Sequence, residues 1–168
     1  FLYTADGVVN ANDDINGTVD FANQSGVLNV ADAVNLDAIQ STGGTNGTVN
    51  FSKSATVNGD LGDVTNQIAQ INIGTADDGI QDTVTANGDV YATNVNFQDN
   101  DEFIIAADQN LTAGSVTTAN DGEGILTLAG GTQTVTGSLG DATNALAVLS
   151  LGADGADSVM NNDVYADL

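Results

Sequence analysis

Two acid-rich loops carry the residues of this sequence that are best suited to bind a metal ion. The stretch "GTADDGIQD" contains Asp77, Asp78 and Asp82, and "GADGADSVMNND" contains Asp154 and Asp157. Carboxylates on flexible turns are the hard oxygen ligands that Ca²⁺ prefers. The two loops are therefore candidate calcium sites. Neither loop matches the EF-hand or the G-G-x-G-x-D repeat, so solvated carboxylates that only keep the chain soluble remain the alternative.

The sequence offers few residues for catalysis. Lys53 is the one cationic residue, and the chain has no His, Arg or Cys. Parallel β-helices include enzymes that cleave polysaccharides, and these reactions need a paired acid and base, usually with a cationic residue that holds the substrate. A carboxylate pair such as Asp99 with Asp101 is present, but the sequence supplies no further residues for such a site. We expect no enzyme activity, no catalytic residues and no cofactor other than Ca²⁺.

The net charge of −22, from 23 acidic residues against a single Lys, limits the partners of the chain. Nucleic-acid binding needs cationic side chains to neutralise phosphates, so we expect no nucleic-acid partner. An anionic membrane surface would repel the chain. No apolar run approaches the ~18 residues of a membrane-spanning helix, so we expect no direct membrane insertion. Divalent cations are the small partners that this charge favours.

Residue types and their alternation predict an all-β protein. All the acidic residues except Glu102 and Glu123 are Asp, which favours turns, and the chain contains 20 Gly and no Pro. The triplet V-[N/D]-F occurs at Val19–Phe21, Val49–Phe51 and Val95–Phe97. In a strand, the Val and Phe of each triplet would face the core and the middle residue would face water. The main competing interpretation is a helix at 62–73 and its counterpart at 140–151.

An internal repeat is visible in the chain. Thr56–Gly74, "TVNGDLGDVTNQIAQINIG", matches Thr134–Gly152, "TVTGSLGDATNALAVLSLG", at an offset of 78 residues. The phrase "DVYA" then follows at 89–92 and again at 163–166. Self-similarity of this kind is typical of repeat architectures.

The sequence pattern that is interrupted at the end of the chain resumes at its beginning. Residues 14–31 parallel 108–130, which follow the first "DVYA", so the two ends read as adjacent phases of one repeat. The "DVYA" copies are 74 residues apart within the chain and 94 apart through the ends, a difference of 20 residues. A fold that gains or loses such a unit is built of stacked coils, each of which contacts only its neighbours.

These observations predict the architecture. We expect a right-handed parallel β-solenoid (β-helix) of about nine coils with about 19 residues each, built from two homologous repeats. We expect a single module over 1–168, with wrap-around repeats at approximately 89–162 and at 163–168 continuing into 1–88. The matching ends further predict that copies of the chain associate end to end.

The repeated stretches resemble a known family. "TVTGSLGDATNALAVLSLGAD" with "NDVYA", and "LTAGSVTTANDGEGILTLAGG", are similar to the passenger repeats of rickettsial outer membrane proteins A and B, which are autotransporter-type surface antigens. The resemblance implies a surface-exposed β-solenoid. The expected function is that of a structural repeat module in a secreted or cell-surface fibre or coat protein. The alternative is an adhesin stalk or passenger fragment that binds a host or surface ligand.

Overall fold

The computed structural model describes residues 2, 5–31, 33–76, 78–152 and 157–167, and the secondary structure in these ranges is entirely β. The strands are β1 (Val8–Ala11), β2 (Val19–Asp20), β3 (Val27–Val30), β4 (Val34–Leu36), β5 (Ile39–Gln40), β6 (Asn46–Phe51), β7 (Ala55–Val57), β8 (Ile68–Ile73), β9 (Thr83–Ala86), β10 (Val90–Phe97), β11 (Glu102–Ile105), β12 (Leu111–Thr118), β13 (Glu123–Leu128), β14 (Thr132–Leu139), β15 (Leu146–Leu151) and β16 (Asp157–Met160). In the same ranges, no helix of a length and hydropathy that would span a bilayer is found.

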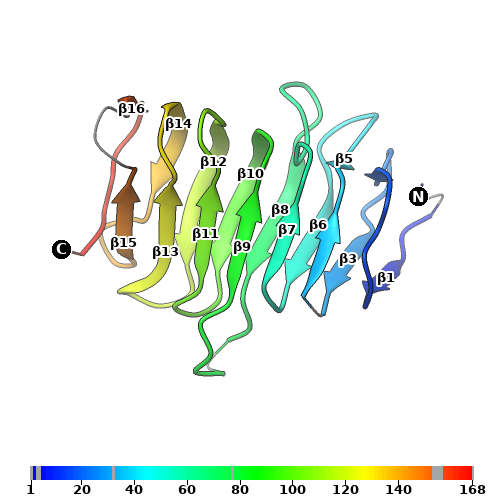
Figure 1. Ribbon diagram of the computed structural model, residues 1–168, viewed down its shortest axis with the longest axis horizontal. Coiled ribbons are helices and arrows are strands. Elements are labelled where there is room, and N and C mark those ends of the chain that lie inside the picture. Colours follow the sequence, from blue (N-terminus) through cyan, green and yellow to red (C-terminus); the bar gives the residue numbers. More distant parts are fainter. Residues whose placement is uncertain (1, 3–4, 32, 77, 153–156, 168) are drawn as a thin grey trace.

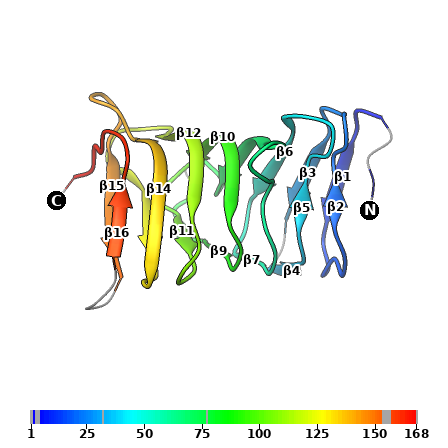
Figure 2. The same cartoon turned by 90° about the horizontal axis from the view of Figure 1, so that it is seen from above.

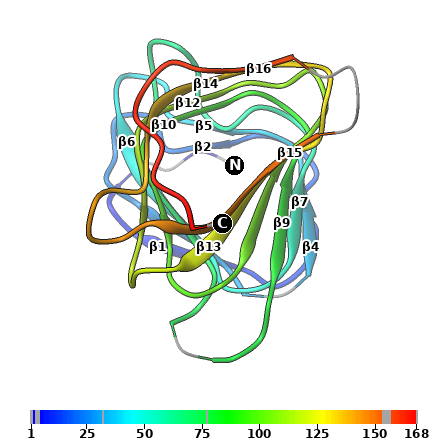
Figure 3. The same ribbon diagram turned by 90° about the vertical axis from the view of Figure 1, so that its left-hand side faces the viewer.

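All strand pairs are parallel, and the strands form stacked sheets along a rod. One sheet has the order β1-β3-β6-β8-β10-β12-β14-β16, a second has β15-β13-β11-β9-β7-β4, and β2 pairs with β5. The chain winds from one end of the rod to the other, with its termini at opposite ends (Figures 1 and 2). Viewed along the axis, the coils superpose around a common interior (Figure 3). The predicted parallel β-solenoid is confirmed.

Three ladders of inward-facing residues run along the rod, one on each face, and each ladder joins residues that are paired in register. The first ladder consists of Val9, Leu28, Val49, Ile71, Val95, Val116, Leu139 and Val164. The second consists of Ile15, Leu36, Val57, Ala86, Ile105, Leu128 and Leu151. The third consists of Val19, Ile39, Leu61, Val90, Leu111, Val135 and Met160.

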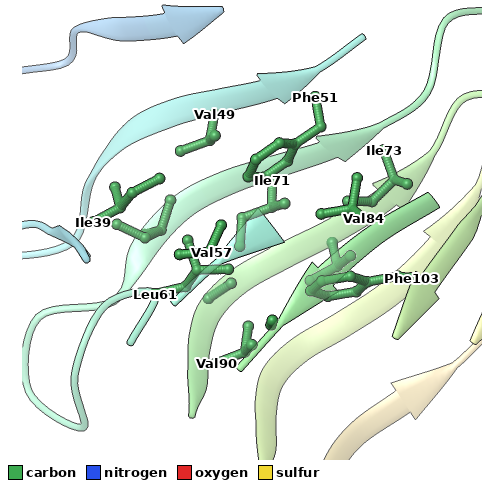
Figure 4. Packing of buried hydrophobic residues seen from close by; sticks show 14 of the residues in the cluster. Ile39, Val49, Phe51, Val57, Leu61, Ile71, Ile73, Val84, Val90 and Phe103 are labelled. Carbon is green, nitrogen blue, oxygen red and sulfur yellow. The ribbon is translucent and has the colours of Figure 1, made fainter. Parts of the chain in front are cut away.

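The ladders form one continuous hydrophobic core. Nearly all ladder residues between the two end coils are fully buried, and Phe21, Phe51, Phe97 and Phe103 are buried in the same cluster. Figure 4 shows Phe51 and Phe103 among the aliphatic side chains. The V-[N/D]-F triplets behave as predicted, because their Val and Phe side chains are buried while the middle residue stays partly exposed. Aliphatic side chains together with four Phe rings therefore fill the interior of the solenoid.

The solenoid has fewer coils than predicted. The first ladder takes seven steps from Val9 to Val164, with 19 to 25 residues in each step, so the rod has about seven turns and not nine. The longer turns contain loops at 62–67, 74–82 and 140–145, which add residues at a corner without adding a strand. The 19-residue coil therefore holds only for the shortest turns.

The two matched stretches fold in the same way locally. In both, a Leu of a ladder is followed by a glycine with positive φ, Gly62 or Gly140, and then by a tight turn and a strand, β8 or β15. A Cβ on either glycine would strike the carbonyl oxygen of a "DVYA" tyrosine in the next coil. The helix considered for both stretches is wrong, because turn and strand occupy these residues.

The matched stretches lie on different faces of the rod. Leu61 belongs to the third ladder, whereas its counterpart Leu139 belongs to the first. Between them the chain passes from one face to the next ten times. Because each turn has three faces, this is three and one-third turns. The second copy of the matched sequence is therefore rotated about the rod axis by one face relative to the first. That the whole chain is built from two homologous repeats stays a prediction.

Candidate functional site

Aspartate side chains at the corners of the solenoid bind backbone N–H groups of the adjacent coil. Asp14 accepts a hydrogen bond from the N–H of Asn35 at 2.7 Å, and Asp89 accepts one from Asn110 at 2.7 Å. The same type of bond joins Asp6 to Ser25, Asp20 to Thr42, Asp37 to Gly17, Asp60 to Asp89, Asp108 to Thr132 and Asp121 to Ala145. At a corner the strand ladder is interrupted, so these carboxylates satisfy N–H groups that would otherwise lack a partner.

The two G-D-x-T-N turns use aspartate within a single coil. Asp63 accepts bonds from the N–H groups of Thr65 and Asn66 at 2.7 and 2.8 Å. Bonds from the side chains of Asn66 and Thr65 contribute most to lowering the pKa of Asp63 to about 2. Asp141 makes the matching bonds in the second copy, and its pKa is also lowered, mainly by the Thr143 hydroxyl. Both carboxylates are therefore ionised parts of the turn itself.

Lys53 lies at a corner that carries Asp78, Asp82, Asp99 and Asp101. Its Nζ is 3.3 Å from Oδ2 of Asp78 and 3.3 Å from Oδ2 of Asp82. Hydrogen bonds to Asp78 and then to Asp82 raise the pKa of Lys53. The pKa of Asp78 is lowered, first by the N–H of Ile80 and also by the bond from Lys53. The Lys side chain thus ties the loop at 74–82 to the preceding coil.

Asp101 lies beneath this loop and is the least solvated acidic residue among those described. It is 1% exposed, and its Oδ1 accepts the N–H of Asp82 at 2.7 Å. Its Oδ2 is buried without any hydrogen-bond partner, against Gly74, where a Cβ would collide with it. Burial raises the pKa of Asp101, and the negative charges of Asp82, Asp99 and Asp78 raise it further. This carboxyl therefore holds the Asp82 end of the loop at a cost in charge burial.

The predicted calcium ligands are only partly brought together. Asp78 and Asp82 share Lys53, while Asp157 lies at the start of β16, several coils away. Asp77 and Asp154 lie outside the described residues. Within the part of the chain that the structure describes, no group of three or more acidic side chains is arranged to hold a metal ion. Calcium binding stays a prediction for both loops.

A row of amides lies on the outer side of the first face. Asn29 donates to Asn10 at 2.9 Å, Asn50 donates to Asn29 at 2.8 Å, and Asn72 donates to Asn50 at 2.7 Å. Thr117 then bonds to Asn96, whose backbone is in register with Asn72. The V-N-F triplets indicated two of these positions from sequence. The row joins successive coils by side-chain bonds, in addition to the backbone ladder.

Comparison with known proteins finds a distant similarity to a rickettsial outer membrane protein. Outer membrane protein A of Rickettsia rickettsii is 36% identical to this chain over 121 residues, which cover 69% of the chain and 5% of that protein. The chain thus spans about a twentieth of the length of this relative. No family model matches the chain, and no solved structure matches it. The similarity agrees with the expected resemblance to rickettsial outer membrane proteins and is distant.

Proposed function

We propose that this chain is a structural, non-catalytic module of a secreted or cell-surface protein, where it forms part of a fibre or coat. The observation that carries this proposal is the unbroken stacking of coils: three aliphatic ladders run the length of the rod. Such a solenoid resists bending because every coil is bonded to its neighbours. The similarity to an outer membrane protein supports a place at the cell surface.

In this role, copies of the module stack end to end, either as a tandem array within one chain or as separate chains. Divalent cations would favour stacking, because neighbouring coils lie ~4.8 Å apart, well within the ~8 Å screening length at physiological salt. The acidic corners of adjacent modules otherwise repel each other. The work of the protein would then be mechanical, as a spacer or a protective layer.

Labelling of intact cells tests the location and the structural role together. Antibodies raised against residues 1–168 should bind intact source cells, with an antibody to a cytosolic protein as the negative control. Deleting the coding segment in frame should thin the surface layer seen by cryo-electron tomography while leaving the parent protein exported. Labelling that requires permeabilised cells would contradict the proposal.

An adhesin stalk or passenger fragment is the alternative function, and the loops favour it. The loops at 62–67 and 74–82 expose Val64 (75%) and Ile80 (54%), which among the described residues are the exposed large apolar side chains that lie away from the first and last coils. Exposed apolar residues on loops are common in binding surfaces. If the chain is an adhesin, beads coated with it should bind host cells, and Val64→Ser with Ile80→Ser should abolish binding. Equal binding by the variant would exclude these loops as the contact.

A further inference from the structure

The first face of the solenoid carries no charge along its strands. These strand segments contain neither an acidic residue nor the Lys, and they are residues 8–11, 27–30, 48–51, 70–73, 94–97 and 115–118. The other two faces do carry acids, since Glu102 lies outward on β11 and Asp20 lies outward on β2. In a chain with a net charge of −22, the outer side of these six segments is therefore a neutral strip.

Amide and hydroxyl side chains cover the middle of the neutral strip in two parallel rows. One is the row of amides that begins at Asn10, and it continues in register from Asn72 through Asn96 to Thr117. The other lies two residues earlier on the same strands and consists of Thr48, Gln70, Asn94 and Ser115. Hydrogen-bond donors and acceptors therefore recur along the rod at the strand spacing of ~4.8 Å.

The bonds within the rows orient the amides without using all of their hydrogen-bonding groups. Asn29, Asn50 and Asn72 each donate one N–H to the preceding coil, whereas an amide nitrogen carries two. The second N–H of each has no acceptor among the described residues, and all three side chains are only partly buried. Gln70 donates to Asn72 at 2.8 Å and so joins the two rows. These amides are pre-organised, so little further ordering is needed when a ligand binds.

A hollow of about 280 Å³ opens on the neutral strip where the chain leaves β8. Uncharged residues line it, mainly Asn29, Asn50, Asn72, Ser52, Thr75 and Gln98. The hydroxyl of Thr75 donates to the carbonyl oxygen of Ser52 at 3.4 Å, which holds the start of the 74–82 loop beside the amides. The hollow therefore has a floor of amides and a wall of backbone.

We propose that the neutral strip binds a neutral polysaccharide, with one sugar unit in the hollow. Sugar hydroxyls both donate and accept hydrogen bonds, so they match a surface that offers amide N–H and C=O groups side by side. The net charge of −22 would repel an acidic polymer, and the strip has no carboxylate that could hold a cationic one. This inference rests on the proposed location at the cell surface and deepens it, because the rod would lie against a layer of polysaccharide.

The size and composition of the neutral strip argue against a protein partner. From Asn10 to Thr117 it spans five strand spacings, about 24 Å, and four residues of strand give it a width of about 13 Å. The resulting area of roughly 300 Å² is far below the ~800 Å² per partner of a standard protein interface. Binding energy at such interfaces is also concentrated in residues such as Trp, Tyr and Arg, and the two rows contain none of these.

Affinity electrophoresis tests the proposal. The chain is strongly acidic and migrates fast in a native gel, so a neutral polysaccharide cast into the gel retards it only by binding. We expect retardation by at least one neutral polysaccharide from a set of a soluble β-glucan, an α-mannan and a galactomannan. The dependence of mobility on polysaccharide concentration gives the Kd. Alginate, which is anionic, and glycol chitosan, which is cationic, serve as the controls for charge, and we expect no retardation by alginate.

A pair of substitutions locates the binding site. Asn50→Thr with Asn72→Thr removes two amides from the hollow and keeps a residue type that favours strands. The matched control is Asn58→Thr with Asn87→Thr, because these two exposed residues also form an amide bond between coils, at 3.3 Å, but lie at the corner between the second and third faces. We expect the Kd to rise about tenfold in the first variant, as for the loss of one or two hydrogen bonds, and to stay unchanged in the control. Urea unfolding midpoints show that both variants are folded.

Several results would overturn the proposed site. These are free migration in every neutral gel, retardation by glycol chitosan alone, or the same Kd for the parent chain and the Asn50, Asn72 variant. Failure of the site is distinguishable from failure of the proposed function. A chain that is labelled on intact cells but migrates freely would refute the site and leave the surface role standing. A chain that binds polysaccharide through the strip but is never found at the surface would do the opposite.

Discussion

Replacing Asp101 with Asn tests how much the buried charge of this carboxylate destabilises the folded chain. The substitution keeps the shape of the side chain and leaves Oδ1 in place to accept the N–H of Asp82, now at 2.7 Å. It removes a charge from a carboxyl that is 1% exposed and whose Oδ2 has no partner. A buried polar atom without a partner costs about 1–3 kcal/mol, and more when it is charged. The new amide N–H₂ also lacks a partner, so we expect a net gain of about 1 kcal/mol at pH 7.

The gain should depend on pH with a definite sign. Because burial raises the pKa of Asp101, the folded state favours the protonated carboxyl. Its favourable contribution is complete below the ordinary carboxyl pKa near 4 and is lost as the pH rises through the raised pKa. Asp101→Asn should therefore be more stable than the parent chain at pH 7, and the difference should shrink towards zero at pH 3.5.

Urea unfolding at both pH values measures this difference, since the midpoint shifts with stability at constant m. Asp99→Asn is the matched control, because it removes one charge from the same corner at a side chain that accepts bonds from exposed N–H groups. If Asp101→Asn were less stable than the parent at pH 7 by more than 1 kcal/mol, about the energy of one hydrogen bond, the reasoning would be refuted. Such a loss would indicate that the carboxylate is held by a cation.

Four further outcomes follow from the site and the turns. Lys53→Met should lower the melting temperature in low salt, because it leaves two carboxylates unpaired, and the loss should shrink in 1 M NaCl; an equal loss in both salts would contradict an electrostatic role. NMR titration should give Asp63 a pKa of about 2. Since that pKa is lowered, the contribution of Asp63 to stability should be present above pH 4 and lost on acidification. An ordinary pKa would show that the hydrogen bonds of the turn do not stabilise the carboxylate. Gly62→Ala should cost about 1–3 kcal/mol more than Gly79→Ala in urea unfolding, because both glycines have positive φ but only Gly62 would place its Cβ against a backbone carbonyl. Added calcium should raise the melting temperature relative to EDTA if either acidic loop holds the ion, and no change would exclude both sites.

Alternation and spacing were enough to predict the solenoid and much of its core. Val49, Phe51, Val95 and Phe97 were expected to face inward, and all are buried. The number of turns was not predictable, because the loop at 74–82 adds residues at a corner without any change in strand pattern. A repeat in sequence also carries no information about the angle around the axis. Leu61 and Leu139 look equivalent, yet they lie on different ladders.

For a related reason, the sequence could not predict which residues the charged side chains contact. Asp was correctly read as a turn residue, but its acceptor role links residues 19 to 29 positions apart, as from Asp6 to Ser25 and from Asp60 to Asp89. Those links depend on the length of every intervening corner. Lys53 likewise meets acids 25 and 29 residues downstream. Such pairs can be identified only when the register of the coils is known.

The register also explains how a chain with a net charge of −22 can stack its acids at the spacing of adjacent strands. Carboxylates in neighbouring coils lie well within the screening length and must repel. Most of those described accept one or more backbone N–H groups, whose dipoles stabilise the negative charge; the N–H of Asn35, for example, lowers the pKa of Asp14. Glu has one more methylene and would overshoot the N–H of the adjacent coil, which accounts for the near absence of Glu. The single Lys of the chain lies 3.3 Å from both Asp78 and Asp82 and pairs with them. The carboxylates therefore help to join neighbouring coils while they keep their negative charge.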